Sequence, residues 1–284
     1  MPIRLIPVNH FDDAAISVAP AAVSTLPVTA LQTYDREDLY RSPNLDPQVI
    51  TGHWNGNVRV IDHVSVWPSA QRSSLIGSRW RFEFFRDAAW VTSIYDTGTL
   101  DFFAFNGSAF GLAGYGVEPY GVDPTDRTAR LAPFLRYFAA VNAGSFRITI
   151  TNGGAVDKPY FEARRIWMGQ SVIGPRNASF GAAPQWLTNS ELKRTIGGSA
   201  QRLARARWRG LRIDSRVFTE ADRATWSDLL SVCTPDREII LTCFPGEGAR
   251  RERDFTVMGS LEALNPLSFM NRNYHTLQLA IVES

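Results

Sequence analysis

The chain has 284 residues, of which 44% are hydrophobic and 20% are charged, with 30 basic and 28 acidic residues and a formal net charge of +2. This composition is typical of a globular protein that is long enough for two domains with cores of their own. No run approaches about 18 uninterrupted apolar residues, and the first residues include Asp12, Asp13 and Pro20 where a signal peptide needs an apolar segment. We therefore expect neither a membrane span nor an export signal.

Basic charge is concentrated in the second half of the chain. Residues 163–217 hold eleven basic residues against two acidic ones, whereas residues 1–160 hold thirteen basic and fifteen acidic residues. Only Lys158 and Lys193 are lysines, so 28 of the 30 basic residues are arginine. This preference reflects either the base composition of the genome or the planar, bidentate contacts that arginine forms at interfaces. Nucleic acid is one partner for such a patch, but stacking aromatics and a recognition helix are missing from it, which favours contacts with protein partners.

The first half predicts β-structure almost throughout. Strict alternation over residues 79–84 places Trp80, Phe82 and Phe84 on one face of a half-buried strand. Further strands are predicted at residues 58–67, 90–95, 100–105 and 146–151, and a short helix is predicted within residues 130–141, after Pro133. This spacing is typical of a β-sandwich or a jelly roll.

A long glycine-rich segment interrupts these strands. Residues 106–123 contain five glycines interleaved with Phe110, Tyr115 and Tyr120. A compact domain rarely keeps so long a loop without a use. The sequence leaves two interpretations open, a docking loop that packs on a neighbouring subunit and a flexible excursion.

A second module begins near Tyr160, with a strand over residues 161–169, and it contains the most distinctive strand of the chain. Over residues 202–209 the side chains alternate between two faces, so that Arg205, Arg207 and Arg209 share one face. Gly210 interrupts the pattern before an apolar alternation resumes at Leu211 and Ile213, which predicts a bulge at the glycine.

One amphipathic helix follows the arginine-rich strand. Thr219 is a candidate N-cap, with Asp222 three residues later, and the apolar positions of the helix have the spacing i, i+3, i+4, i+7. These positions are Trp226, Leu229, Leu230 and Cys233. Strands over residues 238–244, 255–261 and 276–281 complete a small α+β unit in which the helix covers a sheet.

Signatures of chemistry are weak in this sequence. Four scattered histidines, at positions 10, 53, 63 and 275, do not have metal-ligand spacing, and Cys233 and Cys243 lie within apolar patterns that favour two buried thiols over a disulfide. Residues 111–116 lack the register of a phosphate-binding loop, and residues 169–174 lack the spacing of a nucleophile elbow. We expect no metal, no cofactor and no catalytic activity.

Two further groups of residues could act on carbohydrate. Asp96, Asp101 and Glu118 lie near the aromatic region, although nothing distinguishes them as a catalytic pair. The tryptophans of the first half either form a sugar-stacking platform or, as is more common in alternating strands, belong to the core. They are Trp54, Trp67, Trp80 and Trp90.

The order of these features resembles distal tail and tail-tip proteins of long-tailed, non-contractile bacteriophages. In the first half, residues 34–42 (YDREDLYRS), 64–69 (VSVWPS) and 78–82 (SRWRF) are similar to the discoidin-like or galectin-like jelly-roll module of such proteins. In the second half, residues 165–169 (RIWMG), the Gly197-Gly198 pair, the Thr219 helix and the strand over residues 274–283 resemble their tail-tube-like domain. The chain departs from many distal tail proteins in placing the jelly roll before most of the ring-forming domain.

This resemblance implies a mainly β fold with an N-terminal arm (residues 1–30), a jelly-roll or β-sandwich domain (residues 31–159) and a tail-tube-like α+β domain (residues 160–284). It also implies a structural protein of the virion, made in the host cytoplasm, that forms a ring joining the tail tube to the baseplate. Its partners would be further copies of itself, six rather than three, the tail tube protein, the baseplate hub and other tail-tip proteins. Nucleic acid would be present only as DNA passing through the channel.

The alternative is a carbohydrate-binding attachment protein of the tail tip whose jelly roll contacts the host envelope, with a polysaccharide-degrading enzyme as a third, remote reading. For the ring, the expected interface residues come from the arginine-rich strand and from the glycine-rich segment. They are Arg202, Arg205, Arg207, Arg209, Arg212, Phe110, Tyr115 and Tyr120.

Overall fold

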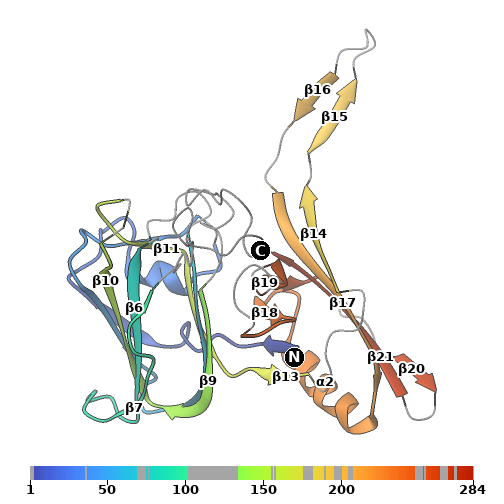
Figure 1. Cartoon of the computed structure of the whole chain (residues 1–284), viewed down its shortest axis with the longest axis horizontal. Coiled ribbons are helices and arrows are strands. Elements are labelled where there is room, and N and C mark those ends of the chain that lie inside the picture. Colours follow the sequence, from blue (N-terminus) through green and yellow to red (C-terminus); the bar gives the residue numbers. More distant parts are fainter. Residues whose placement is uncertain are drawn as a thin grey trace, which may run out of the picture. The chain divides into compact units, whose positions relative to one another are not determined.

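The computed structural model describes residues 3–35, 37–68, 75, 77–101, 134–154, 156, 158–174, 182–188, 190–194, 200–203, 207–246, 252, 254–262, 268–271 and 274–283 (Figure 1). Strands predominate in these residues, and a single α-helix accompanies them, which confirms the predicted mainly β class. The chain divides into two compact units. We call Asn9–Gln170 the sandwich unit, and Met1–Val8 together with Ser171–Ser284 the sheet unit.

This division differs from the predicted boundaries, which separated residues 1–30, 31–159 and 160–284. Strand β12 (Arg165–Gly169) pairs with β5 (Arg59–Trp67) and so belongs to the sandwich unit. Strand β1 (Arg4–Ile6) lies between β13 (Val172–Ile173) and β18 (Ile239–Thr242) in the sheet unit. The sandwich unit is therefore inserted between two neighbouring antiparallel strands, a long-range pairing that local sequence patterns do not reveal.

The sandwich unit consists of antiparallel sheets that enclose one hydrophobic core. The larger sheet has the order β2-β4-β10-β6-β7, with β8 also paired to β6, and the facing strands form the order β12-β5-β9, with a short pair β11-β3 beside them. The bounds of the strands not yet given are β2 (Ala15–Ala19), β3 (Tyr40–Arg41), β4 (Gln48–His53), β6 (Ser78–Phe85), β7 (Ser93–Asp96), β8 (Leu100–Asp101), β9 (Phe134–Ala143), β10 (Ser145–Asn152) and β11 (Glu162–Ala163), and the 3-10 helix is η1 (Val28–Gln32).

Alternation along β6 and β10 builds this core, as predicted. Trp80, Phe82 and Phe84 are completely buried, as are the inward residues of β10. Gly52 on β4 lies opposite Phe146, and a Cβ atom at this position would collide with the Phe146 ring. The missing side chain lets that ring reach Trp54, at 5.3 Å between ring centroids. The glycine in this strand is thus explained by packing.

The helix predicted within residues 130–141 is wrong for the part that the structure describes. Residues from Phe134 onward form the long strand β9, which pairs with β5. Phe138 stacks on Tyr95 with 4.2 Å between ring centroids and contacts Phe84. Packing against a neighbouring strand has overridden a weak local helix pattern.

The strands predicted at residues 90–95 and 100–105 are partly confirmed. The first is shorter than predicted and begins later, at Ser93 of β7. The positive φ of 52° at Trp90 is not an extended conformation, so the strand cannot include this residue. The second begins at Leu100, as β8, and residues 102–105 lie outside the described residues.

The sheet unit contains an eight-stranded antiparallel sheet of order β13-β1-β18-β19-β21-β17-β14, with β20 also paired to β21. A separate two-stranded sheet pairs β15 with β16. The remaining bounds are β14 (Ala183–Thr188), β15 (Glu191–Arg194), β16 (Ala200–Leu203), β17 (Arg207–Phe218), β19 (Thr256–Leu261), β20 (Ser268–Asn271) and β21 (Tyr274–Glu283).

Helix α2 (Glu220–Val232) follows β17 and has the predicted cap. The Thr219 side chain accepts a hydrogen bond from the backbone N–H of Asp222, whose side chain accepts one from the backbone of Thr219, so the capping box is complete. Trp226 and Leu229 are buried in the core of the sheet unit, Cys233 is completely buried, and Leu230 packs against the same cluster. The predicted apolar face of the helix is thus confirmed.

Candidate functional site

The arginine-rich segment, predicted as one strand over residues 202–209, is divided between two strands of a hairpin region at the edge of the sheet unit: Arg202 lies in β16, β17 begins at Arg207, and residues 204–206 lie outside the described residues. Strand β14 pairs with the start of β17 and is the edge strand at that end of the sheet (Figure 1). The chain between these two strands contains the paired strands β15 and β16. We call residues 183–210 the hairpin arm. It holds Lys193, Arg194, Arg202, Arg205, Arg207 and Arg209 against the single acid Glu191.

The bulge predicted at Gly210 is wrong. Gly210 is in register with Gln185 on β14 and with Val282 on β21, and the register shift of β17 lies between Arg216 and Phe218 instead. A Cβ atom at Gly210 would lie 3.1–3.2 Å from side-chain atoms of Gln185 and Leu187, so the glycine makes room for the neighbouring strand.

Unbroken register has a consequence for the arginines. Because side chains alternate along β17, Arg209 lies on the same face as Leu211 and Ile213, which are completely buried. The buried face of the sheet therefore continues into the hairpin arm as the face that carries Arg209.

Arg209 has an acidic partner within the chain. Its backbone N–H donates to Glu283 Oε2 at 2.9 Å, and its Nη2 lies 3.5 Å from Glu283 Oε1. Both side chains are largely buried, at 15% and 20% exposed. Arg212 lies on the other face, where it is 61% exposed and 3.8 Å from a Glu262 oxygen.

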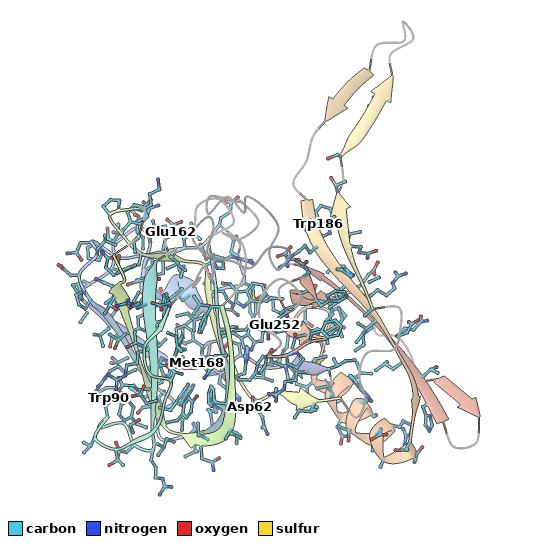
Figure 2. All side chains as sticks on the ribbon, viewed as in Figure 1. Asp62, Trp90, Glu162, Met168, Trp186 and Glu252 are labelled. Carbon is cyan, nitrogen blue, oxygen red and sulfur yellow. The ribbon has the colours of Figure 1, made fainter. Side chains whose placement is uncertain are left out.

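The hairpin arm also exposes apolar surface. Trp186 is opposite Arg209 on β14 and is 67% exposed, as Figure 2 shows at the edge of the unit. Leu187 and Trp208 are paired on the opposite face, and both are half-buried. Sequence reasoning missed Trp186. The signal that could have found it is the adjacent pair Trp186-Leu187, which places apolar residues on both faces of the strand.

The other predicted interface residues are less completely described. Arg202 lies in β16 and Arg207 in β17, and the structure describes their backbone only. Arg205 lies outside the described residues, as do Phe110, Tyr115 and Tyr120 with the rest of the glycine-rich segment.

The tryptophans of the sandwich unit are mainly core residues. Trp54, Trp67 and Trp80 are at most 3% exposed, which confirms the core interpretation for these three. Trp90 is half-buried and lies near β7, at one end of the sandwich unit (Figure 2). The alternative interpretation, a sugar-stacking platform, is therefore excluded for Trp54, Trp67 and Trp80.

The aspartates considered for glycoside cleavage are held by arginines. Asp96 accepts hydrogen bonds from Arg81 with both oxygens, and this contact lowers the pKa of Asp96 below its usual range. Asp101 accepts from Arg79 Nε at 2.9 Å on the exposed face of the same sheet. Because the charged form of Asp96 is stabilised, Asp96 is a poor general acid. Glu118 lies outside the described residues.

Cys233 and Cys243 are free and completely buried, as predicted. Burial raises the pKa of the Cys233 thiol to about 11 and that of the Cys243 thiol to about 12. Among the described residues, three or more potential metal ligands are nowhere grouped together. Within the same residues, α2 and η1 lack the length and apolar character of a membrane-crossing helix.

Two clusters at one end of the sandwich unit combine a tyrosine, an arginine and a carboxylate. In the first, the Arg165 guanidinium lies 4.7 Å from the Tyr34 ring centroid and binds both Asp12 oxygens, at 2.8 and 2.7 Å. Tyr34 is 53% exposed, whereas Arg165 is buried. Tyr34 belongs to the segment that carries the family resemblance, but its role was not predicted.

The second cluster has the same composition. The Arg41 guanidinium lies 4.3 Å from the Tyr160 ring centroid and binds Glu162 Oε2, at 2.6 Å from Nη2 and 3.1 Å from Nε. Glu162 is buried, and Figure 2 shows it at the end of the sandwich unit opposite Trp90. We call these two groups the tyrosine–arginine clusters.

Comparison with known proteins finds no matching protein-family model and no matching curated protein. Solved structures with similarity include the family 32 carbohydrate-binding module of NanJ from Clostridium perfringens in complex with galactose, at 10% identity and a TM-score of 0.40 over 59% of this chain and 99% of that chain. Another is the C-terminal domain of a chitobiase from Bacteroides fragilis, at 15% identity and a TM-score of 0.39 over 57% of this chain and 95% of that chain. Similarity at these TM-scores carries no functional assignment.

Proposed function

We propose that this protein is a structural subunit that assembles with further copies of itself through the hairpin arm. The observation that carries the proposal is Trp186, which is 67% exposed on the edge strand β14, while Leu187 of β14 and Trp208 of β17 lie half-buried on the opposite face of the paired strands. A two-stranded β-ribbon with apolar residues on both faces is only marginally stable in water by itself. A partner that covers both faces and extends the sheet edge would remove this exposed surface from water.

Charge supports a protein partner with acidic groups. The hairpin arm carries six basic residues and one acid, and Arg209 already uses Glu283 within its own chain. The remaining arginines of the arm would pair with carboxylates of a neighbouring copy. Contacts of one surface with a different surface on the next copy generate closed rings when the rotation closes.

We further propose that this assembly is a ring at the distal end of a bacteriophage tail. The support for it is the resemblance of the second half of the chain to tail-tube-like domains. The sheet unit consists of a sheet flanked by α2, together with the hairpin arm. This architecture is suitable for a ring-forming subunit. In this proposal the sandwich unit is attached to the ring-forming sheet unit, because the chain leaves the sheet unit after β1 and returns to it at β13.

The test is the mass and shape of the purified protein. Light scattering coupled to size exclusion is expected to show a concentration-dependent oligomer of six copies, and electron micrographs a ring with a central hole. Trp186→Ser should shift the protein toward the monomer, whereas Val91→Ser, which changes a 79% exposed valine of the sandwich unit, should not. Arg205→Ala with Arg207→Ala should weaken assembly as well, and salt should weaken it in the unmodified protein. A monomer under all these conditions would contradict the proposal.

A second candidate function is carbohydrate binding by the sandwich unit, as expected of a tail-tip attachment protein. The observation that favours it is the exposed ring of Tyr34 at the tyrosine–arginine clusters. Aromatic rings with one apolar face and a polar hydroxyl are common in ligand sites. Binding of host glycans to the isolated protein, measured by calorimetry, tests this candidate independently of assembly.

A further inference from the structure

We propose that the two tyrosine–arginine clusters form one saccharide-binding site, in which Tyr34 and Tyr160 stack on sugar rings. The inference rests on the second candidate function and names the residues that would perform it. It starts from an arrangement that occurs twice at the same end of one unit.

Each cluster holds a tyrosine ring in a fixed place. Arg165 contacts Tyr34 and is itself fixed by two short hydrogen bonds to Asp12 and by a third, from Nη1 to the Leu31 carbonyl oxygen at 3.3 Å. A guanidinium bound by both carboxylate oxygens has little freedom to move. Stacking on such a group orients the tyrosine ring, so that little side-chain entropy remains to be lost when a ligand binds.

The second cluster repeats this construction around a buried carboxylate. Glu162 is 3% exposed and fixes Arg41, which lies over the Tyr160 ring. The arginine therefore stacks on its tyrosine with both of its own hydrogen bonds already directed at the carboxylate. The arginines and carboxylates of the two clusters are engaged with each other, and we assign the contact with a ligand to the aromatic rings because Tyr34 is 53% exposed.

The two clusters are neighbours. Strand β3 ends at Arg41 and pairs with β11, which begins at Glu162, and Arg165 follows two residues after the end of β11. Four residues lie between Tyr160 and Arg165, and the five Cα-to-Cα steps limit the Cα atoms of these two residues to about 18 Å apart. One oligosaccharide could therefore contact both rings.

The chemistry of the site favours a neutral saccharide. The π face of a tyrosine ring is electron-rich and attracts the C–H bonds on the apolar face of a pyranose, and the phenolic hydroxyl can hydrogen-bond a sugar hydroxyl. An anionic ligand such as a phosphate would instead require arginines that are not already paired. Within each cluster the arginine is neutralised by Asp12 or Glu162 at 2.6–2.8 Å.

Saturation-transfer NMR on the full chain tests the site, with the methyl glycosides of galactose, glucose, N-acetylglucosamine and rhamnose as probes. At least one glycoside is expected to bind, with the strongest transfer to its ring C–H protons and with little dependence on salt. Tyr34→Ala and Tyr160→Ala are each expected to weaken binding at least tenfold. Tyr34→Phe, which keeps the ring, should retain most of the affinity.

Matched variants separate the possible failures. Trp186→Ala changes an exposed aromatic residue of the other unit and should leave glycoside binding intact. Trp90→Phe alters the opposite end of the sandwich unit and should have no effect either. Denaturation midpoints show whether a Tyr34 or Tyr160 variant has lost its fold. If it has, Tyr34→Leu keeps an apolar contact for Arg165 but no flat ring, and it should still lose binding.

Three outcomes would overturn the proposal. If no glycoside binds the unmodified protein, both the site and the second candidate function fail. If glycosides bind but folded Tyr34 and Tyr160 variants bind equally well, the function stands and the site is elsewhere. If the protein binds glycerol phosphate but no neutral glycoside, and salt abolishes that binding, the ligand class is wrong.

Discussion

Glu283 binds two separate groups of Arg209, the backbone N–H and the guanidinium. This one carboxylate therefore connects the base of the hairpin arm to β21, the last strand of the chain. The arginine-rich face therefore does not consist of equivalent residues. Arg209 has a structural role within the chain, and the arginines beyond it remain the candidates for assembly.

Removing the carboxylate should weaken the sheet unit. Glu283→Ala is expected to lower the free energy of unfolding by about 1.5–3 kcal/mol, because hydrogen bonds to a largely buried charged group are lost. Glu262→Ala removes a long, exposed contact to Arg212 and should cost about 0–1 kcal/mol. Urea titrations followed by tryptophan fluorescence measure both. Equal effects of the two variants would show that Glu283 does not hold the arm.

Helix α2 should depend on its buried face. Leu229→Ala is expected to cost about 2–5 kcal/mol through lost burial and the cavity that remains. Arg223 pairs with Glu220 on the exposed outer side, with 2.6 Å between Nη2 and Oε1, and Arg223→Ala should be nearly neutral because solvent screens this pair. Chemical denaturation of both variants checks this. Small effects at both positions would mean that the helix is not packed on the sheet.

The buried ion pair of the sandwich unit should matter more than an exposed one. Asp12→Ala leaves Arg165, which is 1% exposed, without its carboxylate, and is expected to cost about 3–5 kcal/mol. Asp101→Ala removes an exposed partner of Arg79 and should cost about 0–1 kcal/mol. Thermal unfolding followed by circular dichroism distinguishes the two. A stable Asp12→Ala protein would show that the pair is dispensable for folding.

Alkaline pH should destabilise the sheet unit through its thiols. Burial raises the pKa of Cys233 to about 11 and of Cys243 to about 12, from an ordinary value of 9.0, so the folded state holds these protons more tightly than the unfolded state. Their contribution is complete below pH 9 and is lost as the pH rises from about 9 through the folded-state values.

Comparison with a variant in which both cysteines are alanine isolates this contribution. The unmodified protein should lose stability more steeply between pH 9 and 11 than the variant does, as measured by urea denaturation. The folded protein should also react slowly with a thiol reagent at pH 8, because buried neutral thiols are inert. Fast reaction of both thiols at that pH would contradict the burial.

The sandwich unit should be removable. Leu5 pairs with Val172, so the chain leaves the sheet unit and returns to it on adjacent strands. Deleting residues 9–170 and joining the ends with a short Gly-Ser linker should leave a folded sheet unit that still assembles. Circular dichroism and light scattering check the fold and the assembly. A control that deletes residues 1–170 removes β1 as well and should not fold. If the protein that lacks residues 9–170 does not fold, the sheet unit needs the sandwich unit.

Elements with a local pattern could be predicted from the sequence. Alternation identified the core strands around Trp80 and Phe146, and the capping residue Thr219 with its apolar stripe identified α2. These features follow from side-chain periodicity, which each segment displays without reference to its neighbours.

Tertiary structure alone decided the features that depend on distant residues. The placement of β1 beside β13, the conversion of residues 134–141 from a predicted helix to a strand, and the unbroken register at Gly210 all result from pairing with remote strands. The same holds for the site residues, because only the fold places Arg165 beside Tyr34, exposes Trp186 and pairs Arg209 with Glu283. Long-range contacts between strands carry no local sequence pattern, since the hydrogen bonds that form them involve the backbone of every residue alike.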